Sequence, residues 1–288
     1  MQEACNRESI SHNKKINDFF DSQYNWWEKV YDQSLPKKFF SFEMIKRKQL
    51  IVDLINKKTE KGKITKILEC GCGPGGIIKE LCPLNCQSTG VDINLRHLQR
   101  ARDGIEANVN WLQSDVESLP FRDGSFDIVY CVGVLSYLKE DTAAVAEMSR
   151  VVRDGGLVII SVPNLFMLNK WLDPYYYFAW LPCKLIGKIT TAAYAKAEKT
   201  KNFGTESIRR YGYKKINRLF AIHGMSEIDS INVSFGPFTL WRKEFFSLES
   251  SIKISEMLRK AGEKKSFQLL RFFTNHWITC LTKVRTSP

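Results

Sequence analysis

Apolar runs alternate with amphipathic segments through the middle of the chain. The short apolar runs have the length and residue types of buried strands, and they lie at 64–70, 87–92, 109–114, 126–135 and 157–162. Segments with helical spacing separate several of them, at 76–84, 95–107 and 142–152. Strands that alternate with helices at this interval predict a mainly parallel sheet with helices on both faces.

Further helices and strands are predicted before and after this alternating region. The remaining predicted elements are helices at 14–31, 42–58 and 207–221 and strands at 227–234 and 276–284. A chain of 288 residues is long for one compact domain and short for two, so we expect one domain with insertions. Its expected parts are an N-terminal helical lid or flank at 1–60, a ligand-binding core at 61–164, a lid insertion at 165–206, and the C-terminal part of the fold at 207–288 with a helical insertion near 244–275.

A glycine-rich loop follows the first expected strand and precedes the first expected helix of the core. It reads Glu-Cys-Gly-Cys-Gly-Pro-Gly-Gly over residues 69–76. Glycines there let the backbone turn tightly and let a ligand approach without a Cβ in the way. Gly71, Gly73 and Gly76 also match the spacing of dinucleotide-binding loops. The loop alone therefore leaves a nicotinamide or flavin dinucleotide open.

Three carboxylates narrow the ligand class. Glu69 lies two positions before Gly71, where it disfavours a pyrophosphate and suits an ammonium or sulfonium charge. Asp92 ends the second expected strand, the usual place for an acid that accepts hydrogen bonds from ribose hydroxyls. Asp115 ends the third expected strand, a position suited to an adenine amino group. The three acids together favour a cationic nucleoside.

These motifs, in this order, resemble the class I S-adenosylmethionine-dependent methyltransferases, in their small-molecule (methyltransferase type 11-like) branch. The matching blocks are ILECGCGPGG, GVDIN, SDVESLPFRDGSFDIVYCVGVLSYL and RVVRDGGLVIISVPN, all within 64–164. The resemblance implies a doubly wound α/β fold, Rossmann-like, with a mainly parallel seven-stranded sheet, an antiparallel final strand, N-terminal helices and a helical lid insertion. It also implies S-adenosyl-L-methionine as the cofactor and S-adenosyl-L-homocysteine as the product.

The resemblance also implies where the cofactor lies. Its contacts map onto Glu69, Gly71, Gly73 and Gly75 around the methionine moiety, Asp92 and Ile93 at the ribose, Asp115 and Val116 at the adenine, and Cys131 and Val132 beneath the donor. For Ile93, Val116 and Val132, core packing is an equal alternative. Tyr24 belongs to an aromatic segment at 19–32 that resembles the lid of several small-molecule methyltransferases. Its alternative is the ordinary apolar stripe of a helix.

Methyl transfer from a sulfonium is an in-line displacement, so the protein must position the acceptor, exclude water and remove a proton when the acceptor is a hydroxyl. Many relatives carry a histidine just past the fourth strand, whereas this chain has Ser136 and Tyr137 there. Tyr137 is the candidate for orienting the acceptor, with packing under the lid as the alternative. Each of the four histidines has a structural explanation in the sequence, so none is the expected base.

The excess of positive charge lies in the C-terminal part of the chain. The chain has 43 Lys and Arg against 31 Asp and Glu, a net charge of +12. Residues 1–164 hold 22 of each sign, so the excess lies in residues 165–288. Aromatic and basic residues are interleaved at 170–188, which favours a hydrophobic acceptor, with or without an acidic group, or contact with an anionic membrane surface. A satellite core, a dimer contact and a solvated face are the alternatives, and the sequence leaves the oligomeric state open.

Several classes of protein are disfavoured. The polar opening stretch lacks the apolar core of a signal peptide, so a cytoplasmic location is expected, with peripheral membrane contact at most. The eight cysteines are expected to be reduced thiols, and their spacing makes no zinc pattern, so no metal is expected. No apolar run is long enough to span a bilayer. Nucleic acid is disfavoured because no Asn-Pro-Pro-Tyr-like tetrapeptide follows the fourth strand and no RNA-binding module is visible.

The sequence therefore predicts a methyltransferase that acts on a small, hydrophobic acceptor. O-methylation in specialised or cofactor metabolism is the first expectation. C- or N-methylation of a lipid, a prenyl diphosphate or another anionic acceptor is the alternative within enzymes. From another class, an RNA or DNA methyltransferase or a nucleic-acid binder would use the basic C-terminal part.

Overall fold

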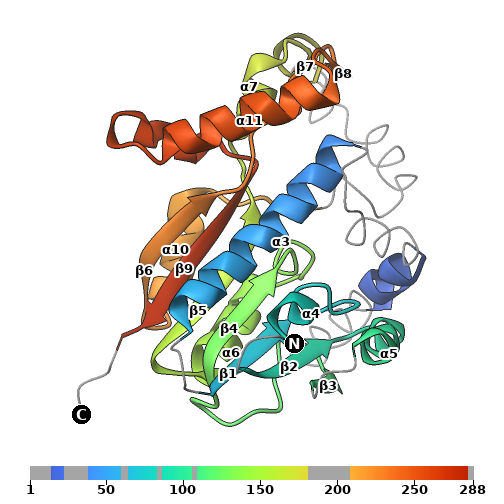
Figure 1. Ribbon diagram of the computed structural model, residues 1–288, viewed down its shortest axis with the longest axis vertical. Helices are drawn as coiled ribbons and strands as arrows, with labels where there is room; N and C mark the ends of the chain where they lie inside the picture. The colour runs from blue at the N-terminus through green and yellow to red at the C-terminus, as the bar shows by residue number, and fades with distance from the viewer. Residues whose placement is uncertain are drawn as a thin grey trace, which may run out of the picture.

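Seven strands form one sheet in the computed structural model, which describes residues 14–22, 38–59, 64–82, 86–105, 109–180 and 208–284 (Figure 1). The strands are β1 Thr65–Cys70, β2 Cys86–Asp92, β3 Asn110–Gln113, β4 Phe126–Val132, β5 Val152–Pro163, β6 Met225–Asn232 and β9 His276–Lys283. Their order is β3-β2-β1-β4-β5-β9-β6. Strands β1 to β5 pair in parallel, and β9 runs antiparallel to both of its neighbours. The expected doubly wound sheet with an antiparallel final strand is confirmed.

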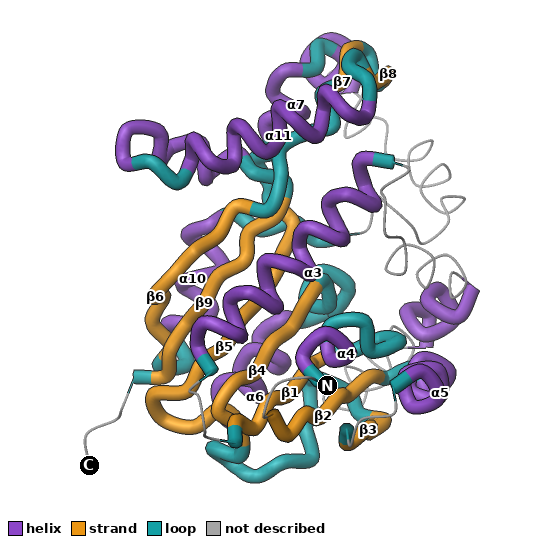
Figure 2. Tube along the Cα trace, viewed as in Figure 1, coloured by secondary structure: helices purple, strands orange, loops and turns teal. Residues whose placement is uncertain are grey.

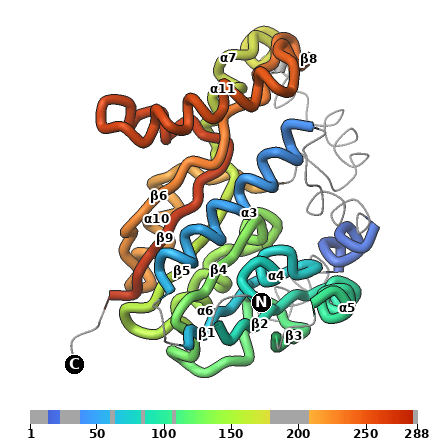
Figure 3. Tube along the Cα trace, in the orientation of Figure 1, coloured from blue at the N-terminus to red at the C-terminus, as the bar shows by residue number. Residues whose placement is uncertain are grey.

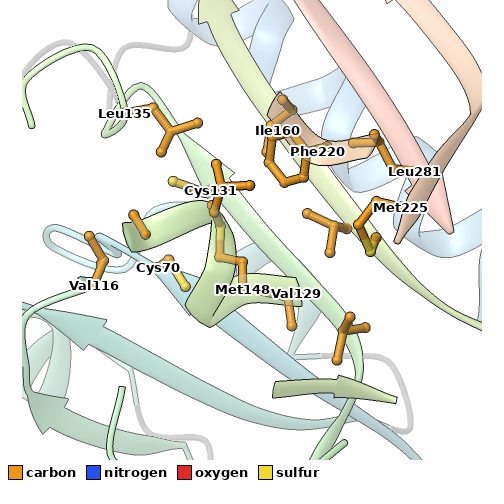
Figure 4. Packing of buried hydrophobic residues seen from close by; sticks show 14 of the residues in the cluster. Cys70, Val116, Val129, Cys131, Leu135, Met148, Ile160, Phe220, Met225 and Leu281 are labelled. Carbon is orange, nitrogen blue, oxygen red and sulfur yellow. The ribbon is translucent and has the colours of Figure 1, made fainter. Parts of the chain in front are cut away.

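Helices cover both faces of this sheet (Figure 2). The described helices with labels are α3 Phe39–Lys58, α4 Ile78–Leu81, α5 Leu95–Gly104, α6 Asp141–Val151, α7 Leu168–Leu172, η1 Tyr176–Trp180, α10 Tyr213–Ala221, α11 Leu248–Gly262 and η2 Lys265–Phe273. Successive strand residues point to opposite faces, so β4 contributes to two cores. Tyr130 packs with Ile51 and Ile55 of α3, whereas Cys131 packs with Met148 of α6 in the cluster that Figure 4 shows.

One expected helix is shorter in the structure. The pattern predicts a helix from residue 207, whereas α10 begins at Tyr213. The backbone before it is extended because Tyr211 pairs with the chain just past β5. Its N–H donates to the carbonyl of Pro163, and its own carbonyl accepts from the N–H of Leu165. The N–H of Arg209 donates to the carbonyl of Ser136. These tertiary hydrogen bonds replace the helical ones and bring residues 208–211 to the carboxyl end of the sheet.

The described part of the insertion, residues 165–180, lies at one end of the molecule together with the hairpin β7 Thr239–Leu240 and β8 Lys243–Glu244 (Figure 1). Asp173 joins the two because its carboxylate accepts hydrogen bonds from the backbone N–H groups of Trp241 and Arg242, each at 2.9 Å. Helix α11 begins beside this end and runs across the molecule. In the part of the chain that the structure describes, no helix is long and apolar enough to span a membrane.

Candidate functional site

A cavity of about 300 Å³ opens at the carboxyl ends of the parallel strands. Ligands of open α/β sheets bind at this edge, outside the carboxyl ends of the strands. The wall combines the glycine loop, the residues that follow β2, β3 and β4, helix 14–22, the start of α3 and the start of β9. One cavity therefore joins segments from both ends of the chain.

Most of the predicted site residues lie in the wall of this cavity. Those that line it are Glu69, Gly71, Gly73, Asp92, Ile93, Asp115, Val116, Val132 and Tyr137. Two predicted residues do not line it. A Cβ on Gly75 would face Ile105 and Trp111, and Cys131 is buried in the core cluster of Figure 4. Tyr24 lies outside the described residues.

The glycine loop owes its shape to two different requirements. Gly71 has a φ of +73°, and a Cβ there would overlap Cγ2 of Val134. Its N–H donates to the carbonyl of Val91 at 2.8 Å, which holds the loop on β2. Gly73 has a φ of +50°, and a Cβ there would meet nothing within 4 Å. Gly71 is therefore required by packing, whereas Gly73 borders open space in which a ligand can approach the backbone.

Asp92 connects the loop to the next helix. Its Oδ2 accepts a hydrogen bond from the N–H of Gly73 at 2.8 Å, and its Oδ1 accepts from the N–H of Asn94 at 2.8 Å. The side chain of Asn94 caps α5 by accepting from the N–H of His97 at 3.0 Å. Burial raises the pKa of Asp92, although these backbone donors and the nearby His97 counteract the rise. The carboxylate fixes the loop and still presents lone pairs to the cavity.

Glu69 is a buried acid in the cavity wall. It is 3% exposed, and its Oε2 accepts a hydrogen bond from the Tyr130 hydroxyl at 3.0 Å. Burial raises the pKa of Glu69 well above its ordinary range, and the charge of Asp92 adds to the rise. A ligand with a positive charge would offset this cost. Together with the open space at Gly73, Glu69 fits the expected cationic cofactor.

Asp115 and Val116 form the wall beyond β3. The Oδ1 of Asp115 accepts from the N–H of Glu117 at 2.9 Å, which shapes the turn. Val116 is buried and belongs to the core cluster as well as the cavity wall. Core packing and ligand contact are thus compatible for this residue.

Helix 14–22 lies beside α5 (Figure 3), and Ile16 of this helix lines the cavity. Phe20 lines the cavity, and its ring centroid lies 5.1 Å from that of Tyr137. The amide of Asn94 donates to Oδ1 of Asn17 at 2.7 Å, which joins the two helices. Tyr137 therefore packs against the N-terminal helix while it faces the cavity.

The far end of the cavity contains a carboxylate–histidine pair that the sequence did not reveal. Nδ1 of His276, at the start of β9, lies 3.1 Å from Oε1 of Glu43 on α3. Ser234 donates a hydrogen bond to the same oxygen. Burial alone would raise the pKa of Glu43, but the charge of His276 and the hydrogen bonds outweigh it and lower the pKa. The two residues are 233 positions apart, so no local pattern links them.

Cationic side chains also reach this end of the cavity. Arg47, one helical turn after Glu43, lines the wall, and its Nη1 would lie 3.4 Å from a Cβ on Gly133. Arg210 lines the wall as well. Burial lowers the pKa of Lys170 to about 8, and the charge of Arg210 contributes to this shift. Burial likewise lowers the pKa of Arg210, so the charges of Lys170 and Arg210 are disfavoured where they lie close together. An anionic group bound beside Arg210 would offset this cost.

The rest of this end is apolar. Its apolar wall residues are Phe40, Met44, Pro163, Met167 and Ile208. Helical spacing indicated that α3 is amphipathic, but not that its buried face ends in a cavity. In the described ranges, no group of three or more histidine, cysteine or acidic residues is arranged to hold a metal ion.

A family model described as a methyltransferase domain matches residues 68–160. The chain is 27% identical over 252 residues to a ubiquinone/menaquinone biosynthesis C-methyltransferase, UbiE, of Francisella philomiragia, with 79% of this chain and 96% of that enzyme covered. It is 33% identical over 137 residues to UbiE of Pseudomonas paraeruginosa, with 44% and 52% covered. It is 28% identical over 117 residues to a malonyl-[acyl-carrier protein] O-methyltransferase of Enterobacter lignolyticus, with 38% and 46% covered. The chain thus spans about half the length of these last two relatives.

Two solved structures share the fold over nearly their whole length. One is magnesium protoporphyrin IX methyltransferase from Synechocystis with bound SAH, at a TM-score of 0.59 and 15% identity, with 93% of this chain and 98% of that chain covered. The other is the [4+2]-cyclase SpnF, at a TM-score of 0.60 and 14% identity, with 95% and 97% covered. At this level of identity the likeness concerns the fold alone.

Proposed function

Because the chain belongs to the class I S-adenosylmethionine-dependent methyltransferases, we propose that it methylates a hydroxyl oxygen of a small, largely hydrophobic acceptor. The cofactor is S-adenosylmethionine. When bound, it supplies an electrophilic methyl group on a sulfonium sulfur. Transfer of the methyl group turns the sulfonium into a neutral thioether, which is the leaving group. The remaining requirements, namely holding donor and acceptor and removing a proton, fall to residues of this chain.

The donor end of the cavity is the part around the glycine loop. In this proposal Glu69 binds the ammonium group of the methionine moiety, and Asp92 accepts hydrogen bonds from the ribose hydroxyls. Asp115 and Val116 hold the adenine. The support is the combination of a buried acid, an open glycine surface at Gly73 and acids at the ends of successive strands.

The observation that carries a methylation with proton removal, as at a hydroxyl, is the Glu43–His276 pair in the same cavity. Glu43 binds Nδ1 of His276, so Nε2 is the ring nitrogen that can take a proton from an acceptor. His276 removes the hydroxyl proton as the new O–C bond forms, and the adjacent carboxylate stabilises the imidazolium that results. Strand β9 lies two strands from β4, about 10 Å at the usual strand spacing, which leaves room for a small acceptor between the donor end and His276.

The acceptor end favours an amphipathic molecule. Phe40, Met44 and Met167 provide apolar walls, whereas Arg210, with Lys170 nearby, provides positive charge. A hydrophobic body would lie against the apolar walls, and an acidic group would lie toward Arg210.

C-methylation is the second candidate. It is favoured by the names of two relatives, both C-methyltransferases, one of which the chain matches over 96% of its length. An acidic carbon also needs a base, so His276 would act in the same way on a C–H group. The position of the new methyl group separates the two reactions.

The test is to incubate the protein with methyl-labelled S-adenosylmethionine and a fractionated cell extract, and to identify the labelled product by mass spectrometry and NMR. A new methoxy group supports O-methylation, and a C-methyl group supports the second candidate. His276→Gln should lower the labelling rate about 100-fold or more while S-adenosylhomocysteine still stabilises the protein against heat. His223→Gln, which does not touch the cavity wall, should change neither.

Each failure has a separate meaning. If S-adenosylhomocysteine does not stabilise the wild-type protein, the assigned donor site is wrong. If it does and no small molecule is labelled, the acceptor class is wrong. If His276→Gln keeps the full rate, the proton goes elsewhere.

A further inference from the structure

The segments α7, η1 and the β7–β8 hairpin form one end of the molecule (Figure 1). They carry several exposed apolar side chains. We call this end the aromatic tip and define it by residues with large exposed fractions: Trp171 52%, Leu172 58%, Tyr177 42%, Phe178 75%, Trp241 53% and Phe245 67%. Single exposed apolar residues are ordinary, but a cluster of this size marks a contact surface. The tip is therefore a candidate contact surface.

Contacts hold the two segments that carry the tip against each other. The rings of Trp171 and Tyr177 lie 6.4 Å apart, and the Tyr177 hydroxyl donates to the carbonyl of Trp171 at 3.0 Å. Across the junction between insertion and hairpin, the guanidinium of Arg242 lies 5.2 Å from the ring centroid of Tyr175. Asp173, fully buried, binds the hairpin turn to the insertion. Two segments far apart in sequence thus present their apolar side chains together.

The turn of the β7–β8 hairpin has a strained backbone. Trp241 and Arg242 have φ values of 51° and 64°, in the left-handed region that asparagine and glycine normally occupy in two-residue hairpins. Side chains with a Cβ are disfavoured in this region. The four hydrogen bonds to Asp173, from Thr239, Tyr175 and the two turn residues, hold the turn in place. Strain of this kind at an exposed tryptophan and arginine points to a role for those two side chains.

The charges around the tip select among partners. Arg242 and Lys243 are exposed at the hairpin, and Lys170 lies on α7. The acids of the same segments are Asp173, which is buried, and Glu244, which is exposed. The accessible surface is therefore aromatic with a net positive rim. Tryptophan, tyrosine and phenylalanine beside lysine and arginine suit the headgroup region of an anionic bilayer.

We propose that the aromatic tip docks the protein on an anionic membrane surface. Trp241, Phe178 and Phe245 enter the interfacial layer, and Arg242 and Lys243 contact lipid phosphates. Met167, which lines the cavity, immediately precedes α7. Docking at the tip therefore places the acceptor end of the cavity beside the bilayer, where hydrophobic acceptors partition. This last step rests on the proposed function, whereas docking itself does not.

Sedimentation with vesicles tests the proposal. The full chain is mixed with vesicles of phosphatidylcholine alone or of phosphatidylcholine with phosphatidylglycerol. We expect binding to the second kind, and weaker binding as NaCl is raised. The double variant Phe178→Ser/Phe245→Ser should bind about tenfold more weakly or worse. Arg242→Gln/Lys243→Gln should lose the preference for the anionic vesicles.

The matched control is Met257→Ser/Leu269→Ser. It removes apolar side chains of similar exposure, 62% and 75%, from α11 and from η2 at the opposite end of α11. We expect this variant to sediment as the wild type does. Stabilisation by S-adenosylhomocysteine should be unchanged in all variants, which shows that each is folded and separates docking from the donor site.

Three results would overturn docking. One is no sedimentation with either vesicle while S-adenosylhomocysteine binding is intact. Another is equal loss of binding in the tip and control variants. The third is a dimer in solution, without vesicle binding, that dissociates in the tip variant, because a second copy of the chain would then be the partner.

Discussion

The buried carboxyl group of Glu69 makes the stability of the protein depend on pH. Its carboxyl group is buried, accepts from Tyr130 and has a pKa raised well above the ordinary range by burial. In the unfolded chain the same group ionises at its ordinary pKa. Above that pH the native state holds one proton more than the unfolded state, so the free energy of unfolding falls as pH rises, up to the raised native pKa.

Glu69→Gln should therefore make the ligand-free protein more heat-stable at neutral pH, and the advantage should shrink as the pH falls toward the ordinary carboxyl range. The same change should weaken S-adenosylhomocysteine binding about 10- to 100-fold, because a charged partner for the ammonium group is lost. Thermal unfolding over a pH series, with and without S-adenosylhomocysteine, measures both effects. Exposed Glu244→Gln is the control, and equal behaviour of the two variants would contradict the assignment.

At the scale of elements, the glycine loop combines, within three residues, a position required by packing and a position that borders open space in the cavity. Gly71 packs against Val134 after β4, so it maintains the contact between two strand ends. Gly73 borders open space, and its N–H binds Asp92. The two glycines look equivalent in sequence, and only the neighbours of each tell them apart.

Alanine at each glycine should separate these roles. Gly71→Ala should lower the free energy of unfolding by about 1–3 kcal/mol, because the new methyl group overlaps Val134. Gly73→Ala should cost roughly 1 kcal/mol from the left-handed backbone, and it should weaken S-adenosylhomocysteine binding more than it weakens the fold. Gly104→Ala, with open space and no positive φ, should change little. Urea unfolding and calorimetric titration give the two quantities, and similar affinities for all three variants would refute the distinction.

At the scale of the whole molecule, the last strand in sequence is not at the edge of the sheet. Strand β9 lies between β5 and β6 and buries Trp277, Ile278, Cys280 and Leu281. It also carries His276 to the carboxyl edge, opposite Pro163. The C-terminal part therefore completes both the core and the cavity.

A chain ending at Asn275 should not fold stably. It would lose the strand that joins β6 to the sheet, and the four buried side chains each contribute on the order of 1–3 kcal/mol, comparable in sum with the total stability of a domain. Far-ultraviolet circular dichroism and thermal unfolding of the purified fragment are the measurements. A cooperative transition like that of the full chain would show that β6 and β9 are dispensable.

Much of the fold could be predicted because its signals are local. The strands of the core, the glycine loop and the acids at strand ends lie within about a hundred residues, with the two-residue period of strands or fixed spacing to glycine. The pattern predicts a helix at 207–221, whereas the helix begins at Tyr213 because Arg209 and Tyr211 hydrogen-bond to distant backbone instead. The hydrophobic pattern along the chain does not show where distant backbone groups replace helical hydrogen bonds.

The sequence by itself determined the sheet, the acids at the strand ends and the position of the excess charge, because each depends on residue type and short-range spacing. Only the tertiary structure brought His276 to Glu43, placed Arg210 in the cavity wall and joined the hairpin to the insertion through Asp173. The physical reason is sequence distance. Side chains of α3 and β9 meet because both pack at the carboxyl edge of one sheet, and no pattern along the chain encodes that meeting.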